Sequence, residues 1–572
     1  MKKKVKIKSY IVIGIIAIFT IIMSSLYMIR NKKSEQNKEI VMAIETTDIE
    51  SNTKQLENEV DTSKWDLNKV WIYTDPDGVK VPVPIGFTAS GAESEKYVNH
   101  NVEKTGTISD LTWSSSGTYP WIQNASNAIW QSGNYNKNNS VSELVSNEII
   151  VGENGGYLSI EWSVSSELNS SYDKTGILWI TITDVINGTS TTPYCMAGKK
   201  CGTNYNSLVF TKYDKELEEG RYVISIKFEK KSSNGWGYGL DRGYVKSGKF
   251  LNYEENGSDK VRIHKAGGLV VYEGTEEVND ENAWSESINR NQFVWIPVDD
   301  VNQIREIDTK TGKMKAKLWD FTASGKTAIS NGNDDMKQEV GIMKGTQKRN
   351  LKFIDSNDEF YKELQSQYLN TISSIEKYGG FYIGRFETSV AYSNPSLESV
   401  HKPKVCRLRE IASNSFGFYN YYMISTRQIS NNDNIQTGMM WGSLFDETFQ
   451  WLIKTGEKSQ AEIAISSFSW GNYTDTVFTH LNKNGVQELK EKGRSKWIPT
   501  GSTEYTKANN IYDLAGNALE YTLENMPGWD RMYCRGGGLC EVHSAFQPAG
   551  ERVFRDITAY YRTATRVYFF IK

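Results

Sequence analysis

Cysteine, histidine and proline are scarce in this chain of 572 residues, which contains 5, 5 and 11 of them. The histidines are scattered, and the sequence contains neither an H-E-x-x-H nor a G-x-S-x-G segment. The local motifs of zinc proteases and of many serine hydrolases are therefore missing. The net charge is only −3, so no basic footprint indicates a nucleic-acid partner.

Glycine and aromatic residues are frequent by comparison. Aromatic residues make up 12% of the chain, with 16 Trp and 32 Tyr, as is typical of β-rich domains. The length alone predicts about three domains. Ser324-Gly325-Lys326-Thr327 matches the end of a phosphate-binding loop, but Asp320 stands where that loop needs its first glycine.

The N-terminus predicts a membrane anchor. Residues 1–8 form a basic cytoplasmic tail, and the uncharged, isoleucine-rich run 9–29 is long enough to span a bilayer as a transmembrane helix. The positive-inside rule then places the bulk of the chain outside, as a single-pass protein of a bacterial cell membrane. A cleaved signal peptide is the alternative, although Ser24-Ser25-Leu26 is a poor cleavage site. Residues 30–62 are polar and acidic, and predict a flexible stalk.

The rest of the chain predicts one domain inserted into another. Residues 63–96 contain short apolar runs and the turn Asp75-Pro76-Asp77-Gly78. They have too few apolar residues to form a hydrophobic core of their own. Matching apolar runs follow only at 267–273 and 292–298. We therefore expect 63–96 and 266–572 to form one domain, with 97–265 as the insert.

The insert has the alternation of β-strands in every window. Leu158, Ile160 and Trp162 alternate with polar residues, and two later runs repeat this pattern with turn residues between them. Such spacing predicts an all-β sandwich. The segment loosely resembles bacterial jelly-roll carbohydrate-binding modules.

Aromatic residues of the insert suggest a glycan ligand. Rings flanked by Ser, Asn and Gly can stack on sugars while amides bond to hydroxyls. The alternative is that the rings pack in the core, because large aromatic side chains are mostly buried. The candidate ligand-binding residues are Trp113, Trp121, Trp130, Trp236 and Tyr238.

The most informative segment runs from Asn509 to Thr522 and is followed by Arg535-Gly536-Gly537-Gly538. Ala515-Gly516-Asn517 predicts a tight turn, because Gly and Asn both tolerate positive φ. Leu519, Tyr521 and Leu523 then alternate with polar residues, as in a half-buried strand.

This segment resembles the N-x-x-G-N-x-W-E-W and R-G-G-S signature of the sulfatase-modifying-factor family, the formylglycine-generating enzymes. Three other pieces agree in order: 381–388 with the early F-x-I-x-x-x-E-V-T strand, 470–472 with W-G-N, and 565–567 with the terminal G-F-R. The resemblance covers 379–572. It implies a C-type-lectin-like fold.

Helical patterns fit that implication. Ser356-Asn357-Asp358-Glu359 is a capping box before an apolar face that ends at Gly379-Gly380, and Ser443 to Lys454 predicts a second helix ending at Gly456. The expected fold class is thus multidomain. An α+β C-type-lectin-like, formylglycine-generating-enzyme-like C-terminal domain carries an inserted all-β jelly-roll sandwich and an N-terminal transmembrane helix.

The resemblance also implies a calcium ion. Carboxylates of Asp513 and Glu520, with carbonyls of Gly516 and Ala518, offer the oxygen ligands that Ca²⁺ prefers. The alternative is a turn whose Asp513 bonds to its own backbone.

The cysteines that the family uses to hold copper are missing, because Glu541 and Phe546 stand at their positions and Gly538 replaces the serine. Cys534 and Cys540 offer an atypical thiolate pair that could bind copper. A structural disulfide, or two unpaired thiols, is the alternative.

Three functions follow from these patterns. The favoured one is a membrane-anchored, catalytically inactive protein whose sulfatase-modifying-factor-like domain binds or displays a glycan or protein ligand. The second is a copper-dependent formylglycine-generating oxidase acting on exported sulfatases through Cys534 and Cys540. The third is a structural spacer.

Overall fold

A computed structural model describes residues 61–572 with gaps. The longer gaps are 90–99, 166–175, 198–209, 231–241, 276–289, 330–358, 389–417, 526–530, 538–547 and 557–562, and the others are of four residues or fewer. The predicted anchor and stalk lie outside the described residues. Among the helices that are described, none is long and apolar enough to cross a membrane.

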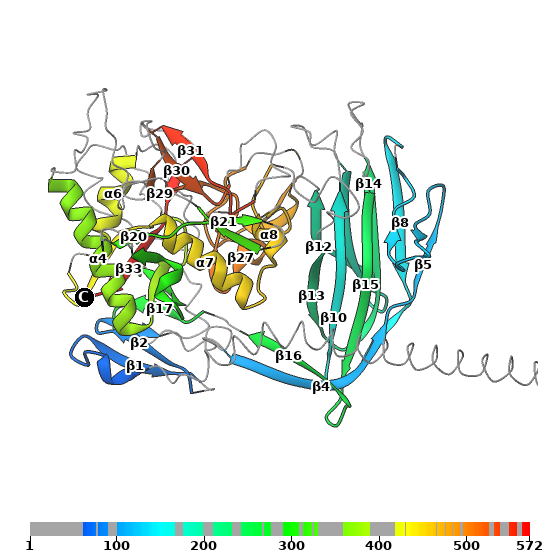
Figure 1. The fold of residues 1–572 in the computed structure, drawn as a ribbon, viewed down its shortest axis with the longest axis horizontal. Coiled ribbons are helices and arrows are strands. Elements are labelled where there is room, and N and C mark those ends of the chain that lie inside the picture. The colour runs from blue at the N-terminus through cyan, green and yellow to red at the C-terminus, as the bar shows by residue number, and fades with distance from the viewer. Residues whose placement is uncertain are drawn as a thin grey trace, which may run out of the picture. The chain divides into compact units, whose positions relative to one another are not determined.

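Residues 100–265 form a β-sandwich (Figure 1). One sheet has the order β13-β10-β15-β4-β16, with β6 and β7 at its side, and the other has the order β12-β11-β14-β8-β5, with β9 beside β14. The first consists of β13 (Thr211–Leu217), β10 (Gly156–Ser165), β15 (Arg242–Tyr253), β4 (His100–Asp110), β16 (Asp259–Lys265), β6 (Ile122–Gln123) and β7 (Trp130–Gln131). The second consists of β12 (Thr189–Ala197), β11 (Gly176–Asp184), β14 (Gly220–Lys230), β8 (Ser140–Ser146), β5 (Trp113–Ser116) and β9 (Ile149–Val151).

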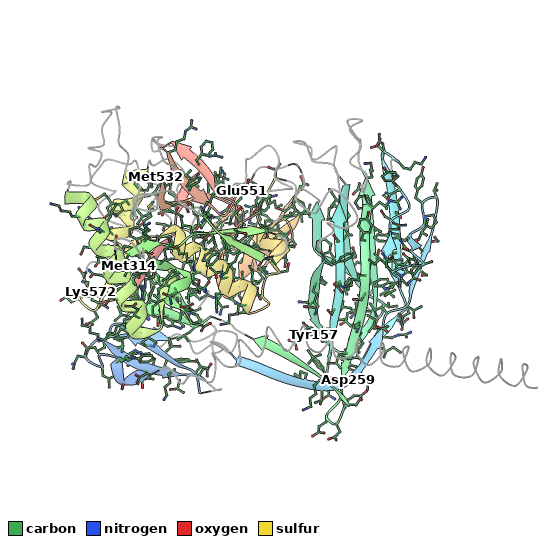
Figure 2. All side chains as sticks on the ribbon, in the orientation of Figure 1. Tyr157, Asp259, Met314, Met532, Glu551 and Lys572 are labelled. Carbon is green, nitrogen blue, oxygen red and sulfur yellow. The ribbon has the colours of Figure 1, made fainter. Side chains whose placement is uncertain are left out.

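The alternating residues of the insert do face inward, which confirms the all-β expectation. Leu158, Ile160 and Trp162 on β10 and Ile224 and Ile226 on β14 are fully buried. Figure 2 shows the side chains that the two sheets carry. The polar partners of this alternation lie on the outer faces, so the sandwich has one core between its sheets.

The second main sheet is built from segments that lie far apart in the sequence. Its order is β24-β33-β23-β18-β17-β3, and all its described pairings are antiparallel. Its strands are β24 (Ile435–Met439), β33 (Val567–Ile571), β23 (Gly380–Gly384), β18 (Gln292–Pro297), β17 (Val270–Glu273) and β3 (Phe87–Ala89). Ala89 on β3 lies opposite Val271 on β17, so the chain leaves this sheet before the sandwich and re-enters it beside the same strand.

Both faces of this sheet are covered, which explains its nearly continuous apolar strands. On one face, Tyr382 stacks on Phe569, with ring centroids 4.5 Å apart, and Val81 and Val83 pack nearby. They belong to β2 (Lys80–Pro84), which pairs with β1 (Val70–Thr74). Helices α4 (Glu359–Tyr378) and α7 (Gly442–Lys454) supply buried side chains to the cluster on the other face.

Both predicted helices are present. In α4, Leu364, Tyr368, Ile372 and Ile375 are buried, and the helix ends before Gly379 at φ +85°. In α7, Phe445, Phe449 and Leu452 are buried, and Gly456 follows at φ +72°. Two further helices are α6 (Phe418–Thr426) and α8 (Gln460–Ala464).

A smaller sheet carries the signature segment. Its order is β31-β30-β29-β32, and β29 and β32 run parallel. Its strands are β31 (Val553–Asp556), β30 (Arg531–Arg535), β29 (Leu519–Asn525) and β32 (Thr563–Thr565). Helices and sheets thus mix in this half of the chain, but the structure by itself does not show a C-type-lectin-like domain.

Short hairpins and 3-10 turns complete the described fold. The paired strands are β19 (Arg305–Ile307) with β20 (Met314–Ala316), β21 (Trp319–Thr322) with β22 (Gly325–Ala328), β25 (Phe478–Leu481) with β26 (Gln487–Lys490), and β27 (Lys507–Ala508) with β28 (Ile511–Tyr512). The 3-10 turns are η1 (Thr62–Lys64), η5 (Val301–Gln303) and η6 (Glu504–Thr506). Lys326 therefore lies on a strand, and not at the start of a helix as in a phosphate-binding loop.

The pairing of β3 with β17 predicts that the insert is dispensable for folding. We expect replacement of residues 97–265 by a short Gly/Ser bridge to leave a cooperative thermal transition in the remainder, because Ala89 and Val271 are already neighbours. Removing residues 567–572, which include β33, is the control and should abolish the transition, because β33 lies between β24 and β23. Loss of the transition in the first variant would contradict the two-domain description.

Candidate functional site

The signature segment forms the tight turn that its sequence predicts. Gly516 and Asn517 have φ +74° and +55°. The backbone of Asn472 lies against this turn: Asn517 N donates to Asn472 O at 2.9 Å, and Asn472 N donates to Ala515 O at 3.2 Å. A Cβ at position 516 would lie 2.5 Å from Asn472 O, so only glycine fits there.

The turn also meets the arginine-glycine segment, because Gly516 N donates to Gly536 O at 2.7 Å. Three of the motifs that were recognised separately in the sequence, at 470–472, 515–517 and 535–537, are therefore adjacent in space. A further motif, at 565–567, reaches the same place through a side chain.

That side chain is Arg566, which is fully buried and paired with Glu520 on β29. Its Nε lies 3.0 Å from both carboxylate oxygens of Glu520. Nη1 donates to Gly384 O and Nη2 to Tyr512 O, each at 2.9 Å. One guanidinium thus joins the signature strand to β23 and β28.

Two more carboxylates are buried beside this pair. Glu387 accepts from Ala518 N at 2.9 Å and from the Asn517 amide at 2.5 Å. Asp513 accepts from Thr500 Oγ1 at 2.8 Å and Gly501 N at 3.1 Å, while its other oxygen is buried with no hydrogen-bond partner in the described structure.

These carboxyl groups hold their protons more tightly than usual. Burial raises the pKa of Glu387 well above its ordinary value, and the charges of Asp513 and Glu520 raise it further. Burial also raises the pKa of Asp513 and of Glu520, although Arg566 opposes both shifts. Three acids against one guanidinium leave an excess of negative charge that protons or a cation must neutralise.

The calcium site at Asp513, Gly516, Ala518 and Glu520 stays a prediction. In the described part of the chain, no group of three or more His, Cys, Asp or Glu side chains is arranged to hold a metal. Both oxygens of Glu520 already accept from Arg566, so this carboxylate would have to turn away to serve a cation. Oδ1 of Asp513 is the better ligand, because its interaction is with the Thr506 side chain and not with a charged group.

Cys534 lies on β30, is fully buried and forms no disulfide with another described residue. Burial raises the pKa of its thiol, which disfavours the thiolate that copper needs. Cys540, Glu541 and Phe546 lie outside the described residues, so the pairing of Cys534 with Cys540 is untested.

An arginine network that sequence reasoning missed lies beside Arg535. Asp446 on α7 accepts from Arg535 Nη2 and from Arg552 Nη2, each at 2.5 Å, and Arg552 Nε donates to Glu524 at 2.5 Å. A Cβ at Gly442 would clash with Glu524 Oε2, so this carboxylate lies at the first residue of α7. Its negative charge interacts favourably with the positive end of the helix dipole. The N-cap residue Trp441 makes no side-chain hydrogen bond there.

The aromatic residues proposed for sugar binding are mostly packing residues. Trp121 is only 3% exposed and lies against Gly243, so its proposed role as a binding platform is corrected: its ring faces are used by the core. Trp113 and Trp130 are half-buried and pack against the same core. Trp236 and Tyr238 lie outside the described residues.

Comparisons with known proteins assign no family. No protein-family profile and no curated protein matches the chain. Among solved structures, PfGH50B is 10% identical over 26% of this chain and 24% of its own length, with TM-score 0.17. The K1 cleaved adhesin domain of Lys-gingipain from Porphyromonas gingivalis W83 is 10% identical over 27% of this chain and 98% of its own, with TM-score 0.18. CBM35 from Cellvibrio japonicus Abf62 is 10% identical over 29% of this chain and 97% of its own length, with TM-score 0.15.

Substitution of Asp513 distinguishes a calcium site from a cluster of protonated carboxyl groups. If Ca²⁺ binds, Ca²⁺ at a hundredfold over its Kd should add about 2.7 kcal/mol to the free energy of unfolding. We expect Asp513→Asn to remove that gain and to stabilise the calcium-free protein, because one of three buried acids is neutralised. Asp433→Asn, on the surface, is the matched control.

The same cluster sets the sign of the pH dependence in calcium-free buffer. Groups whose folded pKa is raised favour folding at low pH, and this contribution is lost as the pH rises through the folded pKa. Thermal melts of wild type and Asp513→Asn between pH 5 and pH 8, with and without Ca²⁺, measure both effects. A calcium gain that persists in Asp513→Asn would contradict the predicted ligand set.

Proposed function

We propose that the chain is a membrane-anchored, extracytoplasmic binding protein. In this proposal, 63–96 and 266–572 form a sulfatase-modifying-factor-like domain of C-type-lectin-like fold, which binds or displays a ligand and does not oxidise one. The observation that carries the proposal is the convergence of the motifs. Residues 470–472, 515–517 and 535–537 contact one another through backbone hydrogen bonds, and Arg566 binds Glu520 between them.

The chemistry of these residues supports binding over oxidation. Glu387, Glu520, Asn517 and Arg566 bond to one another or to backbone groups in the interior, so they hold the turn together. Cys534 is buried, and burial raises the pKa of its thiol. The one cysteine near the signature that the structure describes is therefore poorly suited to hold a redox metal.

The sandwich is the proposed glycan-binding part. Its core uses Trp121, so the remaining candidate platform is formed by Trp236 and Tyr238, which lie outside the described residues, together with the half-buried Trp130. Aromatic rings beside Asn and Ser suit neutral sugars, because a pyranose packs its C–H face on a ring and bonds its hydroxyls to amides. The ligand class is thus a neutral glycan of the cell envelope or surroundings.

Two assays on the purified chain test this function. We expect binding on a glycan array that is lost in the double variant Trp236→Ala and Tyr238→Ala and kept in Trp71→Ala, which removes an exposed ring outside the sandwich. We expect no conversion of the cysteine in a sulfatase-motif peptide after copper loading. Formylglycine formation, detected by mass spectrometry, would replace this proposal with the oxidase function. An empty array would leave the display of a protein ligand as the function.

The anchor is tested on intact cells. If residues 9–29 span the membrane with the lysines inside, added protease should release a large fragment containing the sandwich and the C-terminal domain. A variant with residues 9–29 deleted is the control and should stay inside the cell, where it is protected. Protection of the wild-type chain in intact cells would contradict an outside location.

A further inference from the structure

Lys490, on β26, is a fully buried cation that none of the sequence motifs includes. Its Nζ donates to three main-chain oxygens: Tyr473 O at 2.5 Å, Thr476 O at 2.8 Å and Thr474 O at 3.3 Å. Thr476 Oγ1 lies 3.4 Å from the same nitrogen. An ammonium group has three N–H donors and no acceptor, so the three carbonyl groups match its protonated form. The side chain therefore ends in a site built from main-chain oxygens, called here the carbonyl site.

A local set of hydrogen bonds brings these oxygens together. Thr476 N and Thr476 Oγ1 both donate to Tyr473 O, at 3.2 Å and 2.8 Å, and Tyr473 N donates to Thr476 Oγ1 at 3.0 Å. Lys490 Nζ also lies over the ring of Phe478, 5.5 Å from its centroid. Main-chain carbonyl groups and aromatic faces are both groups that bind monovalent cations. Asp475 lies outside the described residues.

The hairpin that carries Lys490 is held in place by other contacts. Leu481 N donates to Ser502 O at 2.9 Å, and Thr503 Oγ1 donates to Thr479 O at 2.8 Å. The ring of Phe478 stacks on Tyr505, with centroids 4.6 Å apart. Because these contacts fix the strands on both sides of the turn, the ammonium group reaches the carbonyl site from a defined position.

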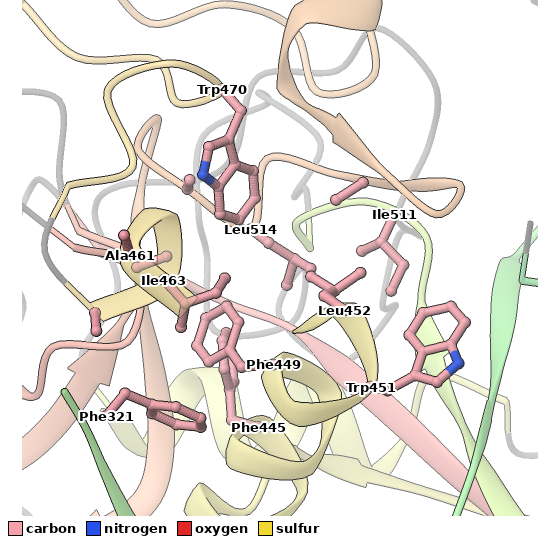
Figure 3. Packing of buried hydrophobic residues seen from close by; sticks show 14 of the residues in the cluster. Phe321, Phe445, Phe449, Trp451, Leu452, Ala461, Ile463, Trp470, Ile511 and Leu514 are labelled. Atoms are coloured by element: carbon pink, nitrogen blue, oxygen red, sulfur yellow. The ribbon is translucent and has the colours of Figure 1, made fainter. Parts of the chain in front are cut away.

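The carbonyl site begins directly after the 470–472 motif. Asn472 Nδ2 donates to Asn517 Oδ1 at 2.9 Å, which joins this motif to the signature turn. At the start of the motif, Trp470 belongs to the same buried cluster as Leu514 (Figure 3). The motif is thus fixed by apolar packing before Asn472 and by a buried cation after it.

We propose that Lys490 is a built-in cation, whose ammonium group occupies the carbonyl site and so holds the 470–472 motif against the signature turn. The ligand class of this site is a primary alkylammonium ion, which supplies one positive charge and three N–H donors. Truncation of Lys490 to alanine removes Cγ, Cδ, Cε and Nζ, and these are the heavy atoms of propylammonium. The truncated protein should therefore bind propylammonium from solution, because the lost side chain leaves a space of that shape.

Amide hydrogen exchange of the full chain measures the effect of the ammonium group. In Lys490→Ala, the amides of Asn472 and Asn517 should lose about tenfold or more of their protection, because a buried charged donor is removed. Propylammonium chloride should restore this protection with a saturable dependence on concentration. Tetramethylammonium chloride at equal ionic strength should not, because its ion carries the charge without an N–H donor.

Three further variants serve as controls. Lys490→Met fills the space of the lost side chain, so it should lose protection as Lys490→Ala does and gain nothing from propylammonium. Lys496→Ala removes a partly exposed lysine that pairs with Glu488, and it should behave as wild type. Asp475→Asn removes a carboxylate between two residues of the carbonyl site, and protection should be kept because the carbonyl groups hold the ammonium.

Refolding keeps the test decisive if Lys490→Ala does not fold by itself. Its folded yield, measured by near-UV circular dichroism, should then recover when propylammonium is present during refolding and not when tetramethylammonium is. Unchanged protection in Lys490→Ala, a loss that propylammonium does not reverse, or an equal recovery with tetramethylammonium would each overturn the proposal. So would an equal recovery in Lys490→Met, or a loss in Asp475→Asn as large as that in Lys490→Ala.

Discussion

The ion pair of Arg566 and Glu520 is the interaction on which the C-terminal half depends. Both side chains are fully buried, so neither charge is stabilised by water, and each needs the other. Arg566 also caps Gly384 O and Tyr512 O, which end β23 and β28. Removing one partner of such a pair costs about 3–5 kcal/mol, because an unpaired charge is left behind. The pair therefore fixes where the last strand meets the signature turn.

Two buried clusters of charged residues in this half differ in their balance of acidic and basic side chains. The arginine network balances Asp446 and Glu524 against Arg535 and Arg552, so it has no excess of either charge. The cluster around the turn has three carboxylates for one guanidinium and must take up protons or a cation. Balanced clusters hold elements in place, whereas unbalanced ones respond to their surroundings.

Much of the fold could be predicted from the sequence, because the spacing of apolar residues and the glycines that end helices are local signals. The apolar face of α4, the glycines after α4 and α7, and the alternation along β10 each indicate their structure within a few residues. The arginine network could not be predicted, because Asp446, Glu524 and Arg552 are far apart in the chain and no motif links them. The sequence left open whether Trp121 binds a sugar or packs in the core, because its burial depends on Gly243, a residue of a distant strand.

Motifs that build a fold do not by themselves report its chemistry. In this chain the matched motif residues are occupied with one another: Asn472 with Asn517, Gly516 with Gly536, and Glu520 with Arg566. The resemblance to formylglycine-generating enzymes implies that the reacting groups would lie just beyond Gly537. There the chain has Gly538, Glu541 and Phe546, which offer neither the hydroxyl nor the two thiols of that family. The hydrogen bonds among the matched residues therefore account for a local turn, and they assign no reaction to it.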